Sequence, residues 1–253
     1  MLYIEGAAGI SGDMTVGALL SLGASQERLK EVLDSLKLGD EFSYVISEKA
    51  SYGIAGTDFD VILPHRHHHH EHGHHHHNHH EHRNLADVEA VIDRGEMSDR
   101  ARALAKRAFR FVAEAEAKAH GKPLDEVHFH EVGAIDSIVD IVSAAVLFDD
   151  LGERECVVTG LTEGSGTVMC AHGELPVPVP AVLNIAAATG VPLRVSDTKG
   201  ECVTPTGIAL AAAFRTREAL PAAYRVKGVG IGLGKRDYGR PAILRIMKIE
   251  AAE

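Results

Sequence analysis

Two histidines and two aspartates occur close together in the segment VHFHEVGAIDSIVDIV, residues 127–142. If the start of this segment is extended, the two-residue period of a strand puts His128 and His130 on one face. Asp136 and Asp140 then follow one turn apart, near the rim of the apolar face of a helix. Imidazole nitrogens and carboxylate oxygens together suit a divalent transition metal. The segment is either a metal site or, on the simpler interpretation, a strand end before a helix with a solvated acidic edge.

Residues 65–82 form a second group with metal-binding chemistry, because thirteen of these eighteen residues are histidine. Such a composition cannot form a packed core, so we expect a disordered loop. The tract is internal and interrupted by other residues, unlike an expression tag. Neutral imidazole binds nickel more tightly than cobalt or iron. We therefore predict that the tract collects metal ions and exchanges them quickly. The ligands expected within it are His67, His68, His69, His70, His72, His74, His75, His76 and His77.

Glycines recur at every third residue between a predicted strand at 2–5 and a predicted helix at 13–22. A strand, a glycine loop and a helix N-terminus together offer backbone N–H groups to a phosphate or carboxylate. The spacing matches neither a dinucleotide-binding fingerprint nor a P-loop. Asp13, the acid of this loop, is either the helix N-cap or a functional carboxylate.

The segment ECVTPTG, residues 201–207, repeats this arrangement before an alanine-rich helix. Thr204 and Thr206 either present hydroxyls to a phosphate, or Thr206 caps the helix. Cys170 and His172 are two residues apart and face the same way in an extended chain. They form either a further ligand pair or ordinary packing.

The elements that must position these residues alternate between strand and helix. We expect strands at 42–47, 57–63, 156–159, 167–172, 228–234 and 243–249, a turn containing Gly53 and Gly56, a loop at 164–167, and helices starting at Asn84, Ser98, Ile135, Pro180 and Ile208. Alternate glycines bare one face of the strand at 228–234, which predicts close backbone packing. The fold class is α+β, with mixed sheet segments, packed helices and a disordered histidine-rich loop. Its expected parts are 1–64, the loop 65–83, and 84–253, which can form one domain with 1–64.

Composition limits the class of protein. The chain has 253 residues, 45% of them hydrophobic, and a formal net charge of −10. An acidic chain is a poor match to nucleic acid or to an anionic membrane. Its three cysteines form no C-x-x-C pair, which argues against a disulfide scaffold. With no basic leader and no apolar run of about 18 residues, we expect a cytoplasmic protein. A homo-oligomer is compatible with the sequence.

Taken together, these motifs resemble the amino-terminal part of the LarC family of nickel-insertion proteins for the nickel-pincer cofactor. The resemblance rests on GAAGISGDM, the histidine tract, HFHEVGAIDSIVDIV, AHGELPVPVPA, ECVTPTG and GVGIGLGKRDYGRPAILR, all in family order. It implies a nickel chelatase, or cyclometallase, of the lyase class that inserts Ni²⁺ into pyridinium-3,5-bisthiocarboxylic acid mononucleotide. Carbon–nickel and sulfur–nickel bonds form, and the product serves lactate racemase and related enzymes. The family uses CTP with Mn²⁺ or Mg²⁺ through a further carboxy-terminal part, which a separately encoded chain would have to supply here.

The resemblance and the motifs together imply a two-stage metal route. The tract collects Ni²⁺, and a tighter site that includes His128 and His130, with Glu131, Asp136 or His172 as a further ligand, receives it. The mononucleotide's phosphate and carboxyl groups are expected at Gly9, Ser11, Gly12, Thr204, Thr206 and Gly207. The base that removes the ring proton is Asp13, Glu131 or Asp136. The alternatives are a nickel storage or delivery protein without chemistry of its own, and a metal-dependent hydrolase.

Overall fold

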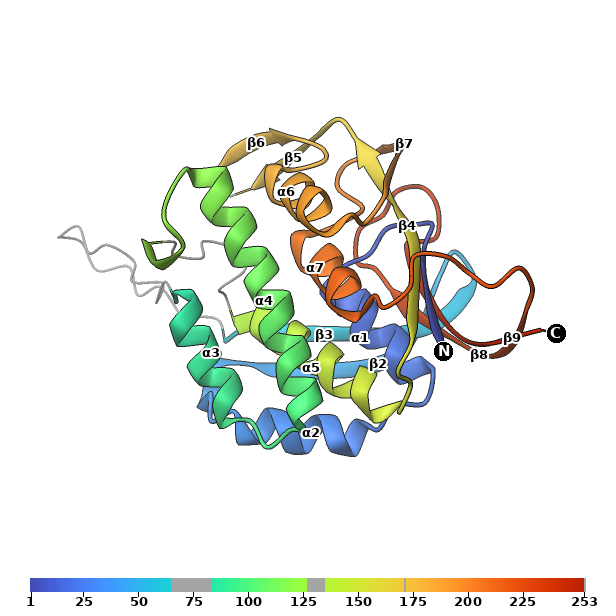
Figure 1. Ribbon diagram of the computed structural model, residues 1–253, viewed down its shortest axis with the longest axis horizontal. Helices are drawn as coiled ribbons and strands as arrows, with labels where there is room; N and C mark the ends of the chain where they lie inside the picture. Colours follow the sequence, from blue (N-terminus) through green and yellow to red (C-terminus); the bar gives the residue numbers. More distant parts are fainter. Residues whose placement is uncertain (65–82, 127–134, 171, 253) are drawn as a thin grey trace.

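The protein is described by a computed structural model that places residues 1–64, 83–126, 135–170 and 172–252 (Figure 1). A seven-stranded mixed sheet has the strand order β2-β3-β8-β9-β1-β4-β7, and a separate hairpin pairs β5 with β6. The strands are β1 (Leu2–Gly6), β2 (Ser43–Ser51), β3 (Ile54–Ile62), β4 (Cys156–Ser165), β5 (Thr167–Cys170), β6 (Gly173–Pro176), β7 (Leu193–Lys199), β8 (Tyr224–Leu233) and β9 (Ile243–Ala251). The predicted α+β class with a mixed sheet is confirmed.

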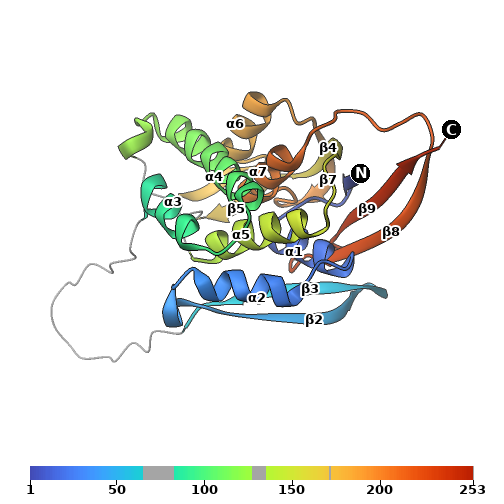
Figure 2. The same cartoon turned by 60° about the horizontal axis from the view of Figure 1, so that its bottom comes forward.

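Seven α-helices of the described residues accompany these sheets. They are α1 (Gly12–Ser21), α2 (Gln26–Ser35), α3 (Leu85–Arg94), α4 (Asp99–His120), α5 (Ile135–Asp150), α6 (Pro180–Thr189) and α7 (Pro205–Phe214). The long helix α4 lies against α5, α6 and α7. Figure 2 shows α2 running along the hairpin of β2 and β3, and α2 also contacts α5. None of the helices described is both long and apolar enough to cross a membrane.

The helix ends follow the expected capping chemistry. Ser98 caps α4 by accepting a hydrogen bond from the Ala101 N–H at 3.0 Å. Gly121 ends the same helix with a left-handed φ of 62°, which a glycine adopts without steric cost. Asn84 begins α3 with a complete capping box. These local signals explain why the helical part of the fold was predictable.

The first strand lies in the interior of the sheet. Ile4 of β1 is paired with Val158 of the parallel strand β4 on one side and with Ile246 of the antiparallel strand β9 on the other. The loop that follows β1 therefore leaves the middle of the sheet. It leads directly into α1.

Helix α1 contacts the glycine face of β8 without side chains between them. A β-carbon added to Gly230 would lie 2.0 Å from the Ala18 carbonyl oxygen, and one added to Gly232 would lie 1.9 Å from the Met14 oxygen. The predicted close backbone packing is confirmed. It fixes the N-terminal end of α1 beside the end of β8.

Two predicted loops belong instead to strands. Gly56 lies within β3, and the turn is formed by Tyr52 and Gly53. Strand β4 continues through Gly164, because β7 continues alongside it and the Gly200 carbonyl oxygen lies where a Gly164 β-carbon would be. Glycine was taken as a loop signal at both positions, but here it permits close backbone contact.

Candidate functional site

The glycine loop, residues 6–12, and the threonine segment, residues 201–207, were predicted separately and are neighbours in the structure. The Ile10 N–H donates to the Cys202 carbonyl at 2.9 Å, and the Thr204 N–H donates to the Ile10 carbonyl at 3.0 Å. A β-carbon at Gly9 would come 2.1 Å from the Cys202 oxygen, and one at Gly207 would come 2.3 Å from the Ile10 oxygen. Both glycines are therefore required by the backbone contact. The starts of α1 and α7 form one structural unit.

The threonines of this unit have different roles from those predicted. Thr204, not Thr206, caps α7, and its hydroxyl oxygen accepts from the Gly207 N–H at 3.1 Å. Pro205 occupies the first helical position, where its missing N–H costs nothing. Thr206 therefore lies inside the helix and is buried. The prediction that Thr206 caps the helix is wrong.

Asp13 is also not an N-cap. Ser11 occupies that position in α1 without capping the helix through its side chain, and its hydroxyl instead donates to the Asp13 carboxylate. Asp13 Oδ1 accepts in addition from the Met14 N–H at 2.9 Å. The N-cap interpretation of Asp13 is wrong, which leaves this carboxylate available for another role.

Helix α5 brings a second carboxylate to the same place. A β-carbon on Gly12 would lie 2.4 Å from Asp140 Oδ2, so the Asp140 side chain covers the first residue of α1. Asp140 Oδ1 is buried and has no hydrogen-bond partner among the described residues. The acidic half of the 127–142 segment and the glycine loop are thus neighbours. The Asp140 side chain occupies the space that a phosphate at Gly12 would need.

The acids at this junction have raised pKa values. Burial raises the pKa of Asp140 well above its usual value, and the charges of Asp13 and then Asp136 raise it further, against Lys235. Burial likewise raises the pKa of Asp13, while the hydrogen bond from Ser11 opposes the rise. Partial loss of hydration raises the pKa of Asp136, although this residue remains at the surface. The site contains carboxyl groups with a higher proton affinity than free aspartate.

Lys235, just after β8, is the cation next to an acidic cluster that consists of Asp13, Asp136 and Asp140. Its ammonium lies 2.5 Å from Asp60 Oδ1 and 3.7 Å from Asp58 Oδ1, and it donates to the Phe59 carbonyl at 3.1 Å. Within the described chain, Lys235 is the cation whose charge lowers the pKa of Asp13 and Asp140. Carboxylates outnumber cations here, so the junction attracts positively charged ligands.

Glu163 is a structural residue of the site that sequence reasoning missed. It is fully buried in β4, and its Oε1 accepts from the Gly164, Cys202 and Val203 N–H groups at 2.7, 2.6 and 3.0 Å. A buried carboxylate with three such donors fixes the backbone that it binds. Glu163 is the one charged residue of β4 and stands beside a glycine, which was the available signal.

The loop after β8 covers the same segment. Burial, then the charge of Glu163, raises the pKa of the Cys202 thiol, and Arg240 opposes the rise. The Tyr238 hydroxyl donates to the Glu201 carbonyl, and burial raises the pKa of Tyr238 to about 12. Cys202 is therefore a protonated thiol in this site near neutral pH.

A pocket of about 460 Å³ opens beside the threonine segment, between the end of α4, the β5–β6 hairpin and the start of α6. Its lining contains the predicted ligand His172, together with His120, Cys170 and Arg236. Two residues of its lining are chain neighbours of residues described above, because Pro205 follows Thr204 and Arg236 follows Lys235. No group of three or more metal-binding side chains is arranged to hold an ion in the described ranges.

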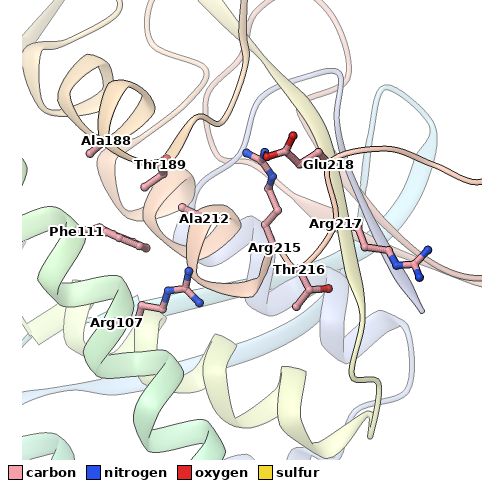
Figure 3. Close-up of a pocket in the computed structure, with 9 residues that line it drawn as sticks. All are labelled: Arg107, Phe111, Ala188, Thr189, Ala212, Arg215, Thr216, Arg217 and Glu218. Carbon is pink, nitrogen blue, oxygen red and sulfur yellow. The ribbon is translucent and has the colours of Figure 1, made fainter.

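A second pocket, of about 360 Å³, lies at the opposite end of α7 and is shown in Figure 3. Its arginines have local partners: Arg215 lies 2.6 Å from Glu218, and Arg217 lies 2.8 Å from Glu155. None of the predicted site residues lines it.

Several predicted ligands cannot be placed. His128, His130, Glu131 and the tract at 65–82 lie outside the described residues. Their roles remain predictions.

Comparison with known proteins gives a consistent result. Residues 2–253 match the family described as nickel insertion protein. The chain is 52% identical to the pyridinium-3,5-bisthiocarboxylic acid mononucleotide nickel insertion protein of Alkaliphilus metalliredigens, over 98% of this chain and 60% of the relative. It is 42% identical to the protein of the same name in Acetivibrio thermocellus (100% and 61%), and 38% identical to a putative nickel insertion protein of Dictyoglomus thermophilum (100% and 61%). The chain thus spans about three-fifths of these relatives. No solved structure matches it.

Proposed function

The chain belongs to the nickel insertion protein family, and on this basis we propose that it takes part in inserting nickel into pyridinium-3,5-bisthiocarboxylic acid mononucleotide. The observation that carries the proposal is the 52% identity, over 98% of the chain, to a relative named for that reaction. The relatives are longer than the matched region, since this chain covers 60% of the first of them. We assign the use of CTP and of Mn²⁺ or Mg²⁺ to the two-fifths of the relatives that lies outside the match.

The reaction requires a base. A carbon–hydrogen bond of the pyridinium ring breaks, its electron pair forms the carbon–nickel bond, and the proton must pass to an acceptor. Nickel remains Ni²⁺ throughout, and the two thiocarboxylate sulfurs donate the other bonds. A carboxylate whose pKa is raised toward the working pH is a suitable acceptor. Asp13 has this property.

Asp140 is added to the candidate bases by the structure. Its carboxylate lies on Gly12, next to Asp13, and the charge of Asp13 raises the pKa of Asp140. Paired carboxylates of this kind share protons, because both cannot be ionised at low cost. We propose that the pair Asp13 and Asp140 receives the ring proton. Asp136 is the more exposed of the three acids and guides the incoming Ni²⁺.

The 460 Å³ pocket is our proposed location for the mononucleotide. Its volume falls within the range of about 300–1,000 Å³ typical of small-molecule sites. Arg236 lines it and can bind a carboxylate or phosphate of the ligand. This differs from the anchors predicted at Gly9, Ser11 and Gly12, because the Asp140 side chain already occupies the space at Gly12.

Reconstitution tests the proposal. The intact chain is combined with the carboxy-terminal part of the Alkaliphilus metalliredigens relative, CTP, Mg²⁺, Ni²⁺ and the mononucleotide. Formation of the nickel-pincer absorbance, and activation of a lactate racemase apoprotein, are measured. Asp13→Asn and Asp140→Asn should each slow product formation by about 10²–10⁴-fold, the usual contribution of a positioned base.

Asp34→Asn is the matched control, since Asp34 is an exposed carboxylate of α2 paired with Lys30. It should leave the rate unchanged. If the wild-type chain binds nickel but yields no product under these conditions, the enzyme proposal fails and nickel storage or delivery replaces it.

A further inference from the structure

The loop between β8 and β9, residues 234–242, contains an arginine with buried nitrogens that have no acceptor. Nε and Nη2 of Arg240 are each buried and have no hydrogen-bond partner among the described residues. A guanidinium stays charged in proteins and carries five N–H donors. Because unpaired buried donors and charges are costly, native structures normally provide a partner for them. These two nitrogens are therefore available to an anion.

The other two cations of this loop are paired within the protein. Lys235 lies 2.5 Å from Asp60 Oδ1. Arg236 lies 3.4 Å from the Glu201 carboxylate and donates to the Glu201 carbonyl at 3.3 Å. A lysine or arginine with a structural role makes contacts of this kind. Nε and Nη2 of Arg240 lack them, which separates Arg240 from its neighbours in the loop.

The groups at Cys202 do not neutralise Arg240. Burial, followed by the charge of Glu163, raises the pKa of the Cys202 thiol, and the nearby Arg240 opposes the rise. Because this thiol is protonated near neutral pH, it offers Arg240 at most a weak acceptor. Glu163 Oε2 is also buried without a hydrogen-bond partner, so this carboxylate does not accept from Arg240. The charge of Arg240 is thus left for another anion.

The same loop contributes to the wall of the 460 Å³ pocket. Arg236 and Glu201 both line the pocket, and Cys202 directly follows Glu201 in the chain. The Tyr238 hydroxyl donates to the Glu201 carbonyl and so ties the loop to that wall. Arg240 is not in the lining, but its side chain is only half-buried as a whole. Side chains often rotate when a ligand binds, even where the backbone moves little, so this guanidinium can turn toward a bound ligand.

The phosphate is the group of the proposed ligand that suits a guanidinium best. In pyridinium-3,5-bisthiocarboxylic acid mononucleotide, each thiocarboxylate gives its sulfur to nickel and keeps a single oxygen. The phosphate monoester has three terminal oxygens, so it can accept two parallel N–H bonds from one arginine. It also carries a larger negative charge than a thiocarboxylate. Geometry and charge therefore both favour the phosphate.

We propose that Arg240 binds the phosphate of the mononucleotide while the pyridinium ring occupies the 460 Å³ pocket. Arg236, which lines the pocket, is left for the oxygens of the thiocarboxylates. This inference rests on the proposed function, because it takes the mononucleotide as the ligand. It adds the residue that distinguishes the phosphorylated ligand from its riboside.

A matched pair of ligands tests the proposal. Nicotinic acid mononucleotide and nicotinic acid riboside differ only in the phosphate, and both carry a pyridinium carboxylate. Their binding to the intact chain is measured by calorimetric titration. The wild type should bind the mononucleotide at least about tenfold more tightly than the riboside, since a charge-assisted pair is made only with the phosphate. Arg240→Gln should bind both with nearly equal affinity. Arg240→Lys keeps the charge but not the planar fork, so it should retain part of the preference.

Arg225→Gln is the matched control, because Arg225 is an exposed arginine near the other end of β8. It should keep the wild-type preference. Arg240→Gln removes a charge with unpaired buried donors, so its thermal unfolding midpoint should be no lower than that of the wild type. A clearly lower midpoint would assign Arg240 to the fold instead and overturn the inference. It is also overturned if the wild type does not prefer the phosphorylated ligand, or if Arg240→Gln keeps that preference.

The reconstituted reaction distinguishes this inference from the proposed function. Loss of a contact made equally in the ground state and the transition state raises KM and leaves kcat unchanged. Arg240→Gln should therefore raise the KM for the mononucleotide at least about tenfold with little change in kcat. If the phosphate preference depends on Arg240 but the wild type yields no product, the phosphate site stands and the enzymatic proposal fails. If Arg240→Gln forms product with the wild-type KM, the phosphate site is wrong and the proposed function stands.

Discussion

The carboxylate of Asp140 lies directly on the backbone of Gly12, where a β-carbon would come within 2.4 Å of Oδ2. This contact joins the first turn of α1 to the first half of α5. It leaves no room for a side chain at residue 12, and it puts a carboxylate beside Asp13. The acidic cluster therefore depends on one glycine.

Gly12→Ala should disturb both stability and activity. The added methyl group displaces the Asp140 side chain, so we expect the free energy of unfolding to fall by about 1–3 kcal/mol. Urea denaturation measures this change. Gly228→Ala is the control, since its β-carbon would meet only the flexible end of Leu22 at 3.2 Å. Equal stability of Gly12→Ala and the wild type would show that the contact with Asp140 does not exist.

Asp140 should make the protein less stable as pH rises. Its pKa is raised in the folded state from 3.8, so the folded protein binds a proton that the unfolded chain releases. The resulting stability is fully present below pH 3.8 and is lost as pH increases through the raised folded pKa. The amide side chain in Asp140→Asn does not titrate. The free energy of unfolding of this variant should therefore vary less with pH and exceed that of the wild type at alkaline pH.

Denaturation curves for both proteins between about pH 4 and 9 test this linkage. Asp34→Asn, at an exposed position, serves as control. Parallel pH profiles for the wild type and Asp140→Asn would contradict the raised pKa.

Glu163→Ala should destabilise the threonine segment. Three buried N–H groups lose their acceptor, and each unsatisfied group costs about 1–3 kcal/mol. Glu163→Gln retains an oxygen acceptor and should be affected less. Hydrogen exchange of the Cys202 and Val203 amides provides a local measure and should accelerate in Glu163→Ala. Unchanged protection of these amides would show that Glu163 does not fix this backbone.

Thr204→Val should weaken the start of α7, because it removes the hydroxyl that accepts from the Gly207 N–H. The expected loss is about 1 kcal/mol in the free energy of unfolding. Thr204→Ser keeps the cap and should retain most of that stability. If valine and serine behave alike, the hydroxyl does not cap the helix.

Local patterns predicted much of the fold. Ser98 and Gly121 mark the two ends of α4 in the sequence, and the alternate glycines of β8 indicated the close contact with α1. In each case the signal is a residue type with a narrow structural use. Two of the family motifs, GAAGISGDM and ECVTPTG, are neighbours, as the contact between Ile10 and Thr204 shows.

The relationships between distant residues could not be predicted in this way. A helical projection puts Asp140 near the rim of α5 but does not say what faces it. Glu163 acquires its role only when the backbone of Cys202 arrives from another part of the chain. His120 reads as an ordinary helix end until His172 is placed beside it. Each of these contacts depends on tertiary structure rather than on periodicity.

The position of β1 in the sheet affects how the chain acquires its structure during synthesis. β1 is synthesised before the other described strands of this sheet, and its partners β4 and β9 are completed only at Ser165 and Ala251. Until then, both edges of Leu2–Gly6 remain without their native strands, and contacts this distant in sequence form slowly. The centre of the sheet is thus assembled only after β9 has been translated. A nascent chain that lacks β9 exposes the apolar strand β1, and an exposed strand edge favours aggregation.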